Sequence, residues 1–202
     1  MTGAAALAIL RRLGVPTVTT SEAAAVLRAS VPAASHTLRR LAAVGLVTPV
    51  RRGVWSLSEA PDPMTLLESV SAPYPSYVSL QSALHLHGLI EQIPQRIYAI
   101  TLGRTARVTT PLASYSFHHV VPAMFAGFET HASGVPVATM EKALIDLFYL
   151  SSTRVRLFGK LPEVELPRAF SFTRARAWVA RIPNVRLRQI AATRLAKLRD
   201  SR

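Results

Sequence analysis

Two arginine pairs lie close together near the N-terminus, Arg39-Arg40 and Arg51-Arg52, and His36 precedes the first pair. Guanidinium groups bind phosphate through a planar fork of N–H donors, and they also form hydrogen bonds with the edges of bases. Histidine can donate or accept such bonds. These residue types at this spacing indicate a surface that binds nucleic acid.

The residues around these side chains predict a helix followed by a β-hairpin. Ser30 can cap a helix that tolerates Pro32 in its first turn and runs to Val44, before Gly45. The next two segments are rich in β-branched and aromatic residues, and they flank the tripeptide Arg51-Arg52-Gly53. A glycine at this place suits the tight turn of a hairpin.

The outward side of this helix and the tip of the hairpin provide the candidate contacts with DNA. At about 100° per residue, Leu38 points inward, while His36 and Arg40 point outward and are candidates for base contacts. Arg39 suits a base or a phosphate, and the hairpin tip suits a phosphate or the minor groove. The candidate DNA-binding residues are Ser35, His36, Thr37, Arg39, Arg40, Arg51 and Arg52. The alternative is that these arginines form an ordinary solvated face on a domain that contacts only proteins.

The rest of the chain predicts an α+β fold in two domains. Earlier helices are expected over residues 4–13 and 20–28, so residues 1–60 predict a winged helix-turn-helix domain. The proline-rich segment 58–64 is the expected boundary. Residues 64–202 predict a mixed α/β domain, with strands within 95–102, 113–121 and 134–138 and helices over 79–89, 139–150, 172–182 and 185–199.

The net charge of +13 is unevenly distributed along the 202 residues. Residues 1–60 contain 7 arginines and 2 glutamates, whereas residues 168–202 contain 10 basic residues and 1 acidic residue. An excess of this size at both ends favours nucleic acid as a partner. A second, possible nucleic-acid patch is formed by Arg174, Arg181, Arg188, Arg194, Lys197 and Arg199.

Several function classes are disfavoured. No apolar run is long enough to span a bilayer, and the alanine-rich N-terminal segment reaches Arg11 and Arg12 too soon for a signal peptide, so we expect a cytoplasmic protein without a membrane partner. The lack of cysteine excludes disulfides and zinc sites built on thiolates. Sequence motifs of hydrolases, nucleotide-binding enzymes and zinc proteases are missing, so we expect no catalytic site, no metal and no cofactor. His85 and His87 lie on different sides of one helix, which indicates structural roles.

Two motifs in the second domain carry a family resemblance. Ser82-Ala83-Leu84 leads to His87-Gly88-Leu89, and Ala138-Thr139 leads to the run Glu141–Leu147. With these motifs, nearly the whole chain resembles AbiEi-type antitoxins of type IV (AbiE) toxin-antitoxin systems. The resemblance implies a repressor that binds inverted repeats in double-stranded operator DNA. It also implies a C-terminal antitoxin domain that counteracts a nucleotidyltransferase toxin without a stable complex.

A second function remains open at the sequence level. A ligand-responsive winged-helix regulator would share the DNA-binding domain but would hold a metabolite in its second domain.

Within the second motif, Lys142 and Asp146 are four residues apart on one predicted helix. Such a spacing predicts an ion pair, which we expect to be partly buried and to tie the helix to the sheet.

Overall fold

The computed structural model describes residues 2–152 and 163–200, and these residues form an α+β fold, as the sequence predicted. The chain divides into two compact units, residues 1–72 with 109–113 and residues 73–108 with 114–202. The first unit thus extends past the domain end at residue 60 that the sequence predicted.

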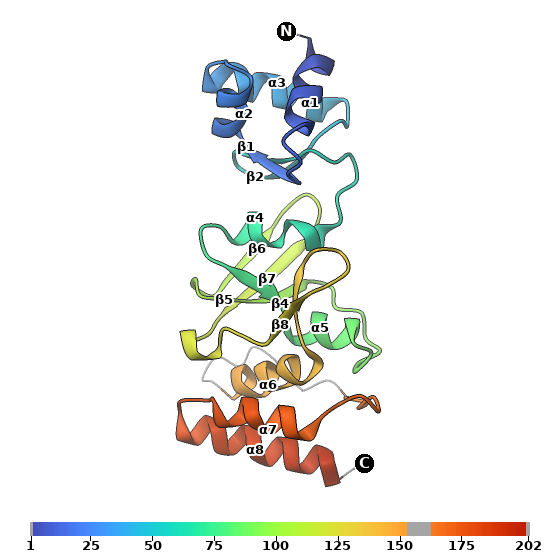
Figure 1. Ribbon diagram of the computed structural model, residues 1–202, viewed down its shortest axis with the longest axis vertical. Coiled ribbons are helices and arrows are strands. Elements are labelled where there is room, and N and C mark those ends of the chain that lie inside the picture. The colour runs from blue at the N-terminus through green and yellow to red at the C-terminus, as the bar shows by residue number, and fades with distance from the viewer. Residues whose placement is uncertain (1, 153–162, 201–202) are drawn as a thin grey trace. The chain divides into compact units, whose positions relative to one another are not determined.

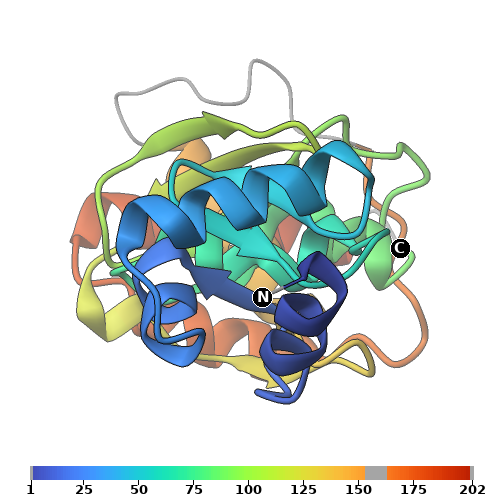
Figure 2. The same cartoon turned by 90° about the horizontal axis from the view of Figure 1, so that it is seen from above.

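The first unit combines helices with a small sheet (Figure 1). Its elements are α1 (Gly3–Arg11), β1 (Thr17–Thr19), α2 (Thr20–Val26), α3 (Val31–Ala43), β2 (Thr48–Arg51), β3 (Val54–Ser56), a 3-10 helix (Pro63–Leu66) and α4 (Leu67–Ser71). The three first helices pack on one another, and Figure 2 shows α3 with α1 and α2 beside it. Their shared core includes Leu10, Val18, Ala23, Leu38 and Trp55.

Local signals explain where these helices begin. Thr19 and Glu22 form a reciprocal capping box at the start of α2, with each side chain bonded to the other residue's backbone N–H. The hydroxyl of Ser30 accepts a hydrogen bond from the Ala33 N–H and so caps α3, and Pro32 lies in the first turn, where no N–H is needed.

The small sheet is antiparallel with strand order β1-β3-β2. Trp55 of β3 pairs with Val18 of β1 on one side and with Pro49 of β2 on the other. The register shifts between Pro49 and Arg51, so a bulge precedes the hairpin tip. The predicted hairpin is therefore confirmed, while β1 is an additional strand that the sequence did not indicate.

Two hydrogen bonds explain why α4 belongs to the first unit. The hydroxyls of Thr17 and Ser69 lie 2.7 Å apart, and the Arg51 Nε donates to the Ser69 carbonyl oxygen at 2.9 Å. Because these bonds fix α4 to β1 and β2, the first unit continues through the proline-rich segment that the sequence marked as a boundary.

The second unit is built on a six-stranded mixed sheet with the order β6-β7-β5-β4-β9-β8. Its strands are β4 (Ser76–Val78), β5 (Ile97–Thr101), β6 (Ala106–Thr109), β7 (Ser114–His119), β8 (Phe128–Thr130) and β9 (Pro136–Ala138). β4 runs parallel to β9, and β5 runs parallel to β7. The β4–β5 and β8–β9 pairs are antiparallel.

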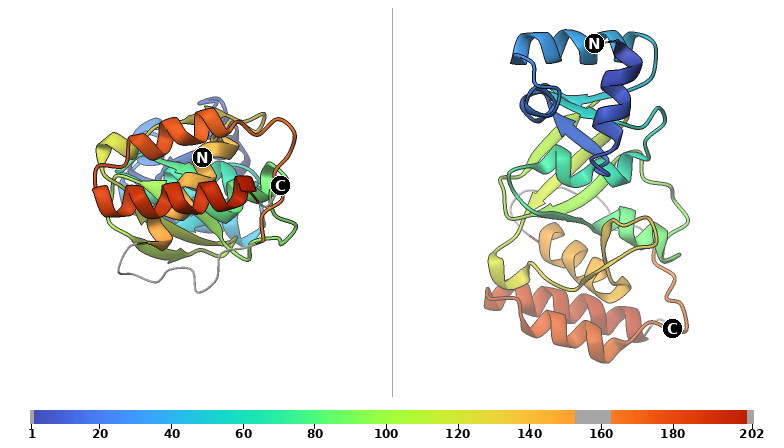
Figure 3. Two further views of the ribbon diagram at one scale, coloured as in Figure 1. Left: turned by 90° about the horizontal axis from the view of Figure 1, so that it is seen from below. Right: turned by 45° about the horizontal axis from the view of Figure 1, so that its top comes forward.

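Helices α5 (Leu80–Leu86) and α6 (Met140–Ser151) pack on each other and on strands β5 and β9 respectively. A short 3-10 helix covers Pro122–Met124. Helices α7 (Phe172–Ala180) and α8 (Val185–Asp200) lie side by side, as Figure 3 shows, and both contact α6. The nine central residues of α6, from Glu141 to Leu150 without Tyr149, are buried, so this helix is the centre of the second unit.

Candidate nucleic-acid interface

The amphipathic pattern of α3 leaves one of its faces open. Leu38 and Leu41 are buried in the core of the first unit, whereas His36, Arg39 and Arg40 are exposed. This division agrees with the faces that the residue spacing predicted. The outward face of α3 therefore presents an imidazole and two guanidinium groups to solvent.

The Arg39 side chain is held in place along the helix. Its Nε and Nη2 both donate to the Ser35 hydroxyl one turn earlier, at 3.3 and 2.9 Å. Ser35 and Thr37 are half-buried and flank the outward face. The Arg40 side chain has no hydrogen bond or ion pair with any described residue, so its donors are available to a partner.

The hairpin tip is tied to the start of α2. Gly53 has a φ of +77°, which favours glycine, and its carbonyl oxygen accepts from the Thr20 N–H at 2.8 Å. The Trp55 Nε1 donates to the Thr20 hydroxyl at 3.0 Å. These bonds fix the position of the tip relative to the α2–α3 pair.

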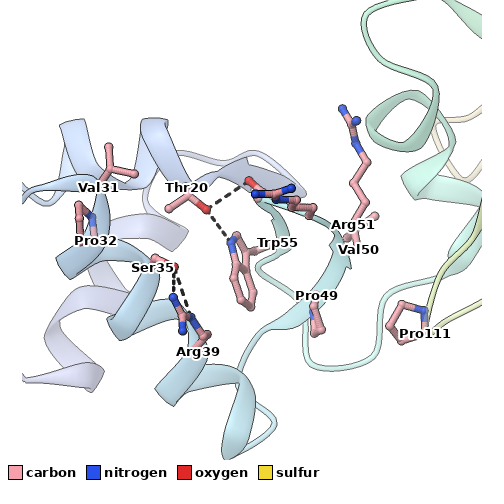
Figure 4. A pocket seen from close by; sticks show the side chains of 12 residues that line it. Thr20, Val31, Pro32, Ser35, Arg39, Pro49, Val50, Arg51, Trp55 and Pro111 are labelled. Carbon is pink, nitrogen blue, oxygen red and sulfur yellow. Dashed lines mark hydrogen bonds between the residues drawn. The ribbon is translucent and has the colours of Figure 1, made fainter.

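The two arginines at the tip, Arg51 and Arg52, differ in their surroundings, although the sequence predicted the same role for both. Arg51 Nε donates to the Ser69 carbonyl oxygen, and Figure 4 shows this side chain turned away from Trp55. Its Nη groups remain available for a further bond. Arg52 is exposed and has no hydrogen bond or ion pair with a described residue. The free cation at the tip is therefore Arg52.

A hollow of about 850 Å³ lies between α3 and the hairpin (Figure 4). Its cationic lining residues are Arg39, Arg51 and Arg52, and its apolar ones include Val31, Pro32, Pro49, Val50 and Trp55. Among the residues that the structure describes, no carboxylate lines it. The hollow thus joins α3 to the hairpin in one surface whose charges are all positive.

Three of the four acidic residues of the first unit are engaged in bonds within it, and the fourth, Glu68, is exposed on α4. Hydrogen bonds from the backbone and side chain of Thr19 lower the pKa of the Glu22 carboxyl, which is engaged in the capping box. Glu59 pairs with Arg11 at 3.2 Å, and the Asp62 carboxylate accepts from the Met64 N–H. Glu22, Glu59 and Asp62 therefore have partners of their own within the first unit.

The basic residues of the predicted C-terminal patch are not brought together as one free surface. Arg174 is bonded to the Glu141 carboxylate, with its Nη2 at 2.9 Å. Arg194 Nη1 donates to the Phe148 carbonyl oxygen at 3.2 Å and to the hydroxyls of Ser151 and Ser152 at 2.6 and 3.0 Å. Both arginines therefore connect α6 to the two last helices.

The other members of this predicted patch lie at different places along α7 and α8. The Arg181 guanidinium lies 4.6 Å from the centre of the Trp178 ring, and Arg199 pairs with Asp200. Arg188 is half-buried and Lys197 is exposed. The geometry therefore offers less support for a second nucleic-acid site than for the surface of the first unit.

The predicted ion pair between Lys142 and Asp146 is confirmed, and it is completely buried rather than partly buried. Lys142 Nζ donates to the Asp146 carboxylate and, at 2.9 Å, to the Tyr77 hydroxyl oxygen. The hydroxyls of Tyr77 and Ser79 donate to Asp146 Oδ2 at 3.1 and 2.8 Å. Burial raises the Asp146 pKa, and Lys142 opposes this effect. The group is sealed from solvent, and its bonds connect Tyr77 of β4 to α6.

Tyr77 and Ser79 were missed as members of this cluster. They lie more than 60 residues from Asp146 in the sequence, at separations of 69 and 67 residues. Tyr77 lies in β4 and Ser79 directly follows this strand, and their spacing of two was a weak signal, since alternate residues of an extended chain face the same side. The partner that makes this spacing meaningful is on α6 and becomes adjacent only through the β4–β9 pairing.

The two histidines for which the sequence predicted structural roles, and the buried His118, lie beside hydrogen-bonding groups of the protein. His85 Nδ1 lies 3.3 Å from the Ile90 carbonyl oxygen, and His87 Nε2 lies 2.7 Å from that of Ala138. His118 is buried in β7, beside the Ser116 hydroxyl at 3.0 Å. Burial, assisted by Arg107, lowers the His118 pKa from 6.5 to about 4. In the part of the chain that the structure describes, no three histidine or acidic side chains gather as metal ligands.

Comparisons with known proteins give no family for this chain: no family model matches it, and no curated protein matches its sequence. Among residues 2–152 and 163–200, no helix has the length and apolar character needed to cross a membrane.

Proposed function

We propose that this chain is a DNA-binding repressor and that its first unit is a winged helix-turn-helix domain. In this proposal α2 and α3 form the helix-turn-helix and the β2–β3 hairpin is the wing. The observation that carries it is the position of two exposed arginines that have no partner among the described residues. Arg40 on α3 and Arg52 on the wing are exposed, and the Thr20 bonds hold the wing at a fixed distance from the helices.

The proposed complex places the outward face of α3 in the major groove. His36 and Arg40 contact base edges, and Arg39, preset by Ser35, contacts a base or a phosphate. Arg52 contacts the phosphate backbone from the wing, and Arg51 joins it through its Nη groups. The all-positive hollow between α3 and the wing suits the sugar-phosphate strand that runs between these contacts.

The biological role in this proposal is that of an antitoxin of a type IV system. The chain represses its own operon at inverted repeats and counteracts a nucleotidyltransferase toxin through the second unit, without a stable complex. This part rests on the resemblance of residues 82–89 and 138–147 to AbiEi-type antitoxins. The buried Lys142–Asp146 pair, which belongs to the second motif, supports a structural role for that motif.

Duplex binding tests the first part of the proposal. Fluorescence anisotropy would measure the full chain against DNA from upstream of its gene at several salt concentrations. We expect Arg40→Ala to lose about 1–3 kcal/mol of binding free energy. Arg52→Ala should lower the slope of log K against log salt by about one. Arg12→Ala, an exposed arginine outside α2, α3 and the wing, is the control. Equal affinities for all three variants and the wild type would contradict the proposal.

Co-expression tests the second part. The chain and a nucleotidyltransferase encoded beside it would be expressed from separate promoters, and growth would be followed. We expect the full chain to restore growth, and we expect a variant with both Arg40→Ala and Arg52→Ala to restore it equally while losing repression of a reporter. A chain that represses the reporter but never restores growth would be a regulator of another kind.

A further inference from the structure

The turn between α2 and α3 contains a residue with an unusual backbone conformation. Arg28 has a φ of +51°, in the left-handed region that normally favours glycine. The Ala29 N–H donates to the Ala24 carbonyl oxygen at 2.9 Å, and the Arg28 N–H donates to that of Ala25. This pattern is the usual way in which a helix ends at a left-handed residue.

Other helices of the same chain end at a left-handed residue that is glycine. Gly14 follows α1, Gly45 follows α3 and Gly88 follows α5, with φ between +66° and +75° and open space where a Cβ would lie. Their common use of glycine fits the steric cost of a Cβ at positive φ. The end of α2 departs from this rule.

Packing does not offset the strain at Arg28. The other described residue with a positive φ that is not glycine, Leu80, is completely buried, so its side chain is stabilised by the core of the second unit. Arg28 is exposed, and its side chain has no hydrogen bond, ion pair or ring contact with any described residue. Nothing within the described chain therefore explains an arginine at this position.

The location of Arg28 offers an explanation. It lies three residues before the start of α3, and Ser30, Val31, Pro32 and Ala33, which follow it, are all exposed. This end of α3 is therefore uncovered. The one acidic side chain of α2, Glu22, is engaged in the capping box at the opposite end of that helix.

We infer that Arg28 contacts a phosphate of the DNA backbone beside the groove that α3 enters. The inference rests on the proposed function and adds a contact from the turn to those from α3 and the wing. The guanidinium is retained there for binding at the expense of stability, because glycine would relieve the backbone and remove the contact.

Two substitutions separate the charge from the strain. Arg28→Gly removes both, so we expect a higher melting temperature together with weaker duplex binding, by roughly 3- to 10-fold at moderate salt, and a salt slope lowered by about one. Arg28→Lys keeps the charge and the strain, so we expect affinity and melting temperature close to those of the wild type. Arg12→Ala is the matched control for loss of an exposed arginine.

The choice of duplex identifies the kind of contact. A phosphate contact is independent of sequence, so Arg28→Gly should weaken binding to the upstream duplex and to an unrelated duplex by similar factors. Arg40→Ala should weaken mainly the upstream duplex. If Arg28→Gly binds both duplexes like the wild type while Arg40→Ala is impaired, the inference is wrong and the proposed function stands. If the wild type binds neither duplex, both are overturned.

Discussion

The arginines of the first unit and those of the last two helices have the same chemistry but different surroundings. Arg40 and Arg52 are exposed without a partner among the described residues, whereas Arg174 and Arg194 bind acceptors on α6. On charge composition alone, the C-terminal group would be the stronger candidate for a nucleic-acid-binding surface, since it is denser in basic residues. What distinguishes the groups is whether the fold supplies an acceptor.

This comparison separates the two kinds of effect that a substitution can have. An arginine or lysine with an internal acceptor contributes to the free energy of unfolding, because its removal leaves a polar group without a partner. A basic side chain without an internal acceptor contributes little to that energy and is available to an external anion. Loss of Lys142 or Arg194 in the second unit should therefore lower stability, whereas loss of Arg40 or Arg52 in the first unit should lower affinity.

The largest expected effect is that of Lys142→Met. Removing a buried cation leaves the Asp146 carboxylate uncompensated, which typically costs about 3–5 kcal/mol of unfolding free energy. Without Lys142 the Asp146 pKa should rise further, so the carboxyl binds a proton in the folded state at higher pH than in the unfolded state. The loss should therefore be greater at pH 8 than at pH 5, as urea denaturation would measure.

The double variant Lys142→Met with Asp146→Leu provides the control for this prediction. It removes both charges and should recover part of the lost stability, although the Tyr77 and Ser79 hydroxyls then lack their acceptor. A single Lys142→Met variant as stable as the wild type would show that this buried pair does not hold the unit together.

The next effect concerns pH and the buried His118. Its pKa is about 4 in the folded protein against 6.5 when unperturbed, so between these values the unfolded chain binds more protons. Unfolding free energy should then fall as the pH drops from 6.5 to 4, by up to about 3 kcal/mol from this residue. His118→Gln should flatten that part of the profile, whereas His119→Gln, the exposed neighbour, should not. Parallel profiles for the wild type and His118→Gln would contradict the assignment.

A smaller loss of stability is expected for Arg194→Ala. The substitution removes three hydrogen bonds to the end of α6, at a cost of about 1–3 kcal/mol, and leaves duplex affinity unchanged. Thermal unfolding and anisotropy would measure the two quantities on the same samples. Lys197→Ala, on an exposed position of the same helix, should change stability by less than about 0.5 kcal/mol. Weaker DNA binding by a fully stable Arg194→Ala variant would show instead that Arg194 belongs to a surface that binds nucleic acid.

The smallest effect is expected for Ser35→Ala. The Ser35 hydroxyl orients Arg39, so its loss should weaken duplex binding by about 0.5 kcal/mol, roughly twofold, without lowering stability. In an Arg39→Ala background the same substitution should have no further effect. Ser21→Ala, on the exposed side of α2, is the control. An undiminished Ser35 effect in the double variant would mean that the serine acts independently of Arg39.

Much of the first unit could be predicted from the sequence because its signals are local. The capping residues Thr19 and Ser30 mark the starts of α2 and α3, and Gly45 marks the end of α3. Leucine spacing identified the outward face of α3, and Gly53 located the hairpin tip. Each of these features depends on residues within one or two turns of each other.

Other features depended on residues that are distant in the chain. The sequence did not indicate strands β1, β4, β6 and β8. Strands β1, β4 and β8 have three residues each and β6 has four, which is too short for an alternation of apolar and polar residues to be recognised. Arg51 and Arg52 were indistinguishable until Ser69, 18 residues after Arg51, was seen to accept a hydrogen bond from it. The six basic residues of the predicted C-terminal patch looked equivalent for the same reason.

The sequence by itself determined the α+β class, the starts of α2 and α3, the outward face of α3 and the hairpin that follows it, because capping, turn formation and amphipathic spacing act over a few residues. The tertiary structure alone decided which charges face solvent and which are neutralised. It places the Ser69 carbonyl oxygen beside Arg51 and the end of α6 beside Arg194. It also places the hydroxyls of Tyr77 and Ser79 beside the Lys142–Asp146 pair. A charge acquires its role from its acceptor, and the acceptors here come from other elements of the fold.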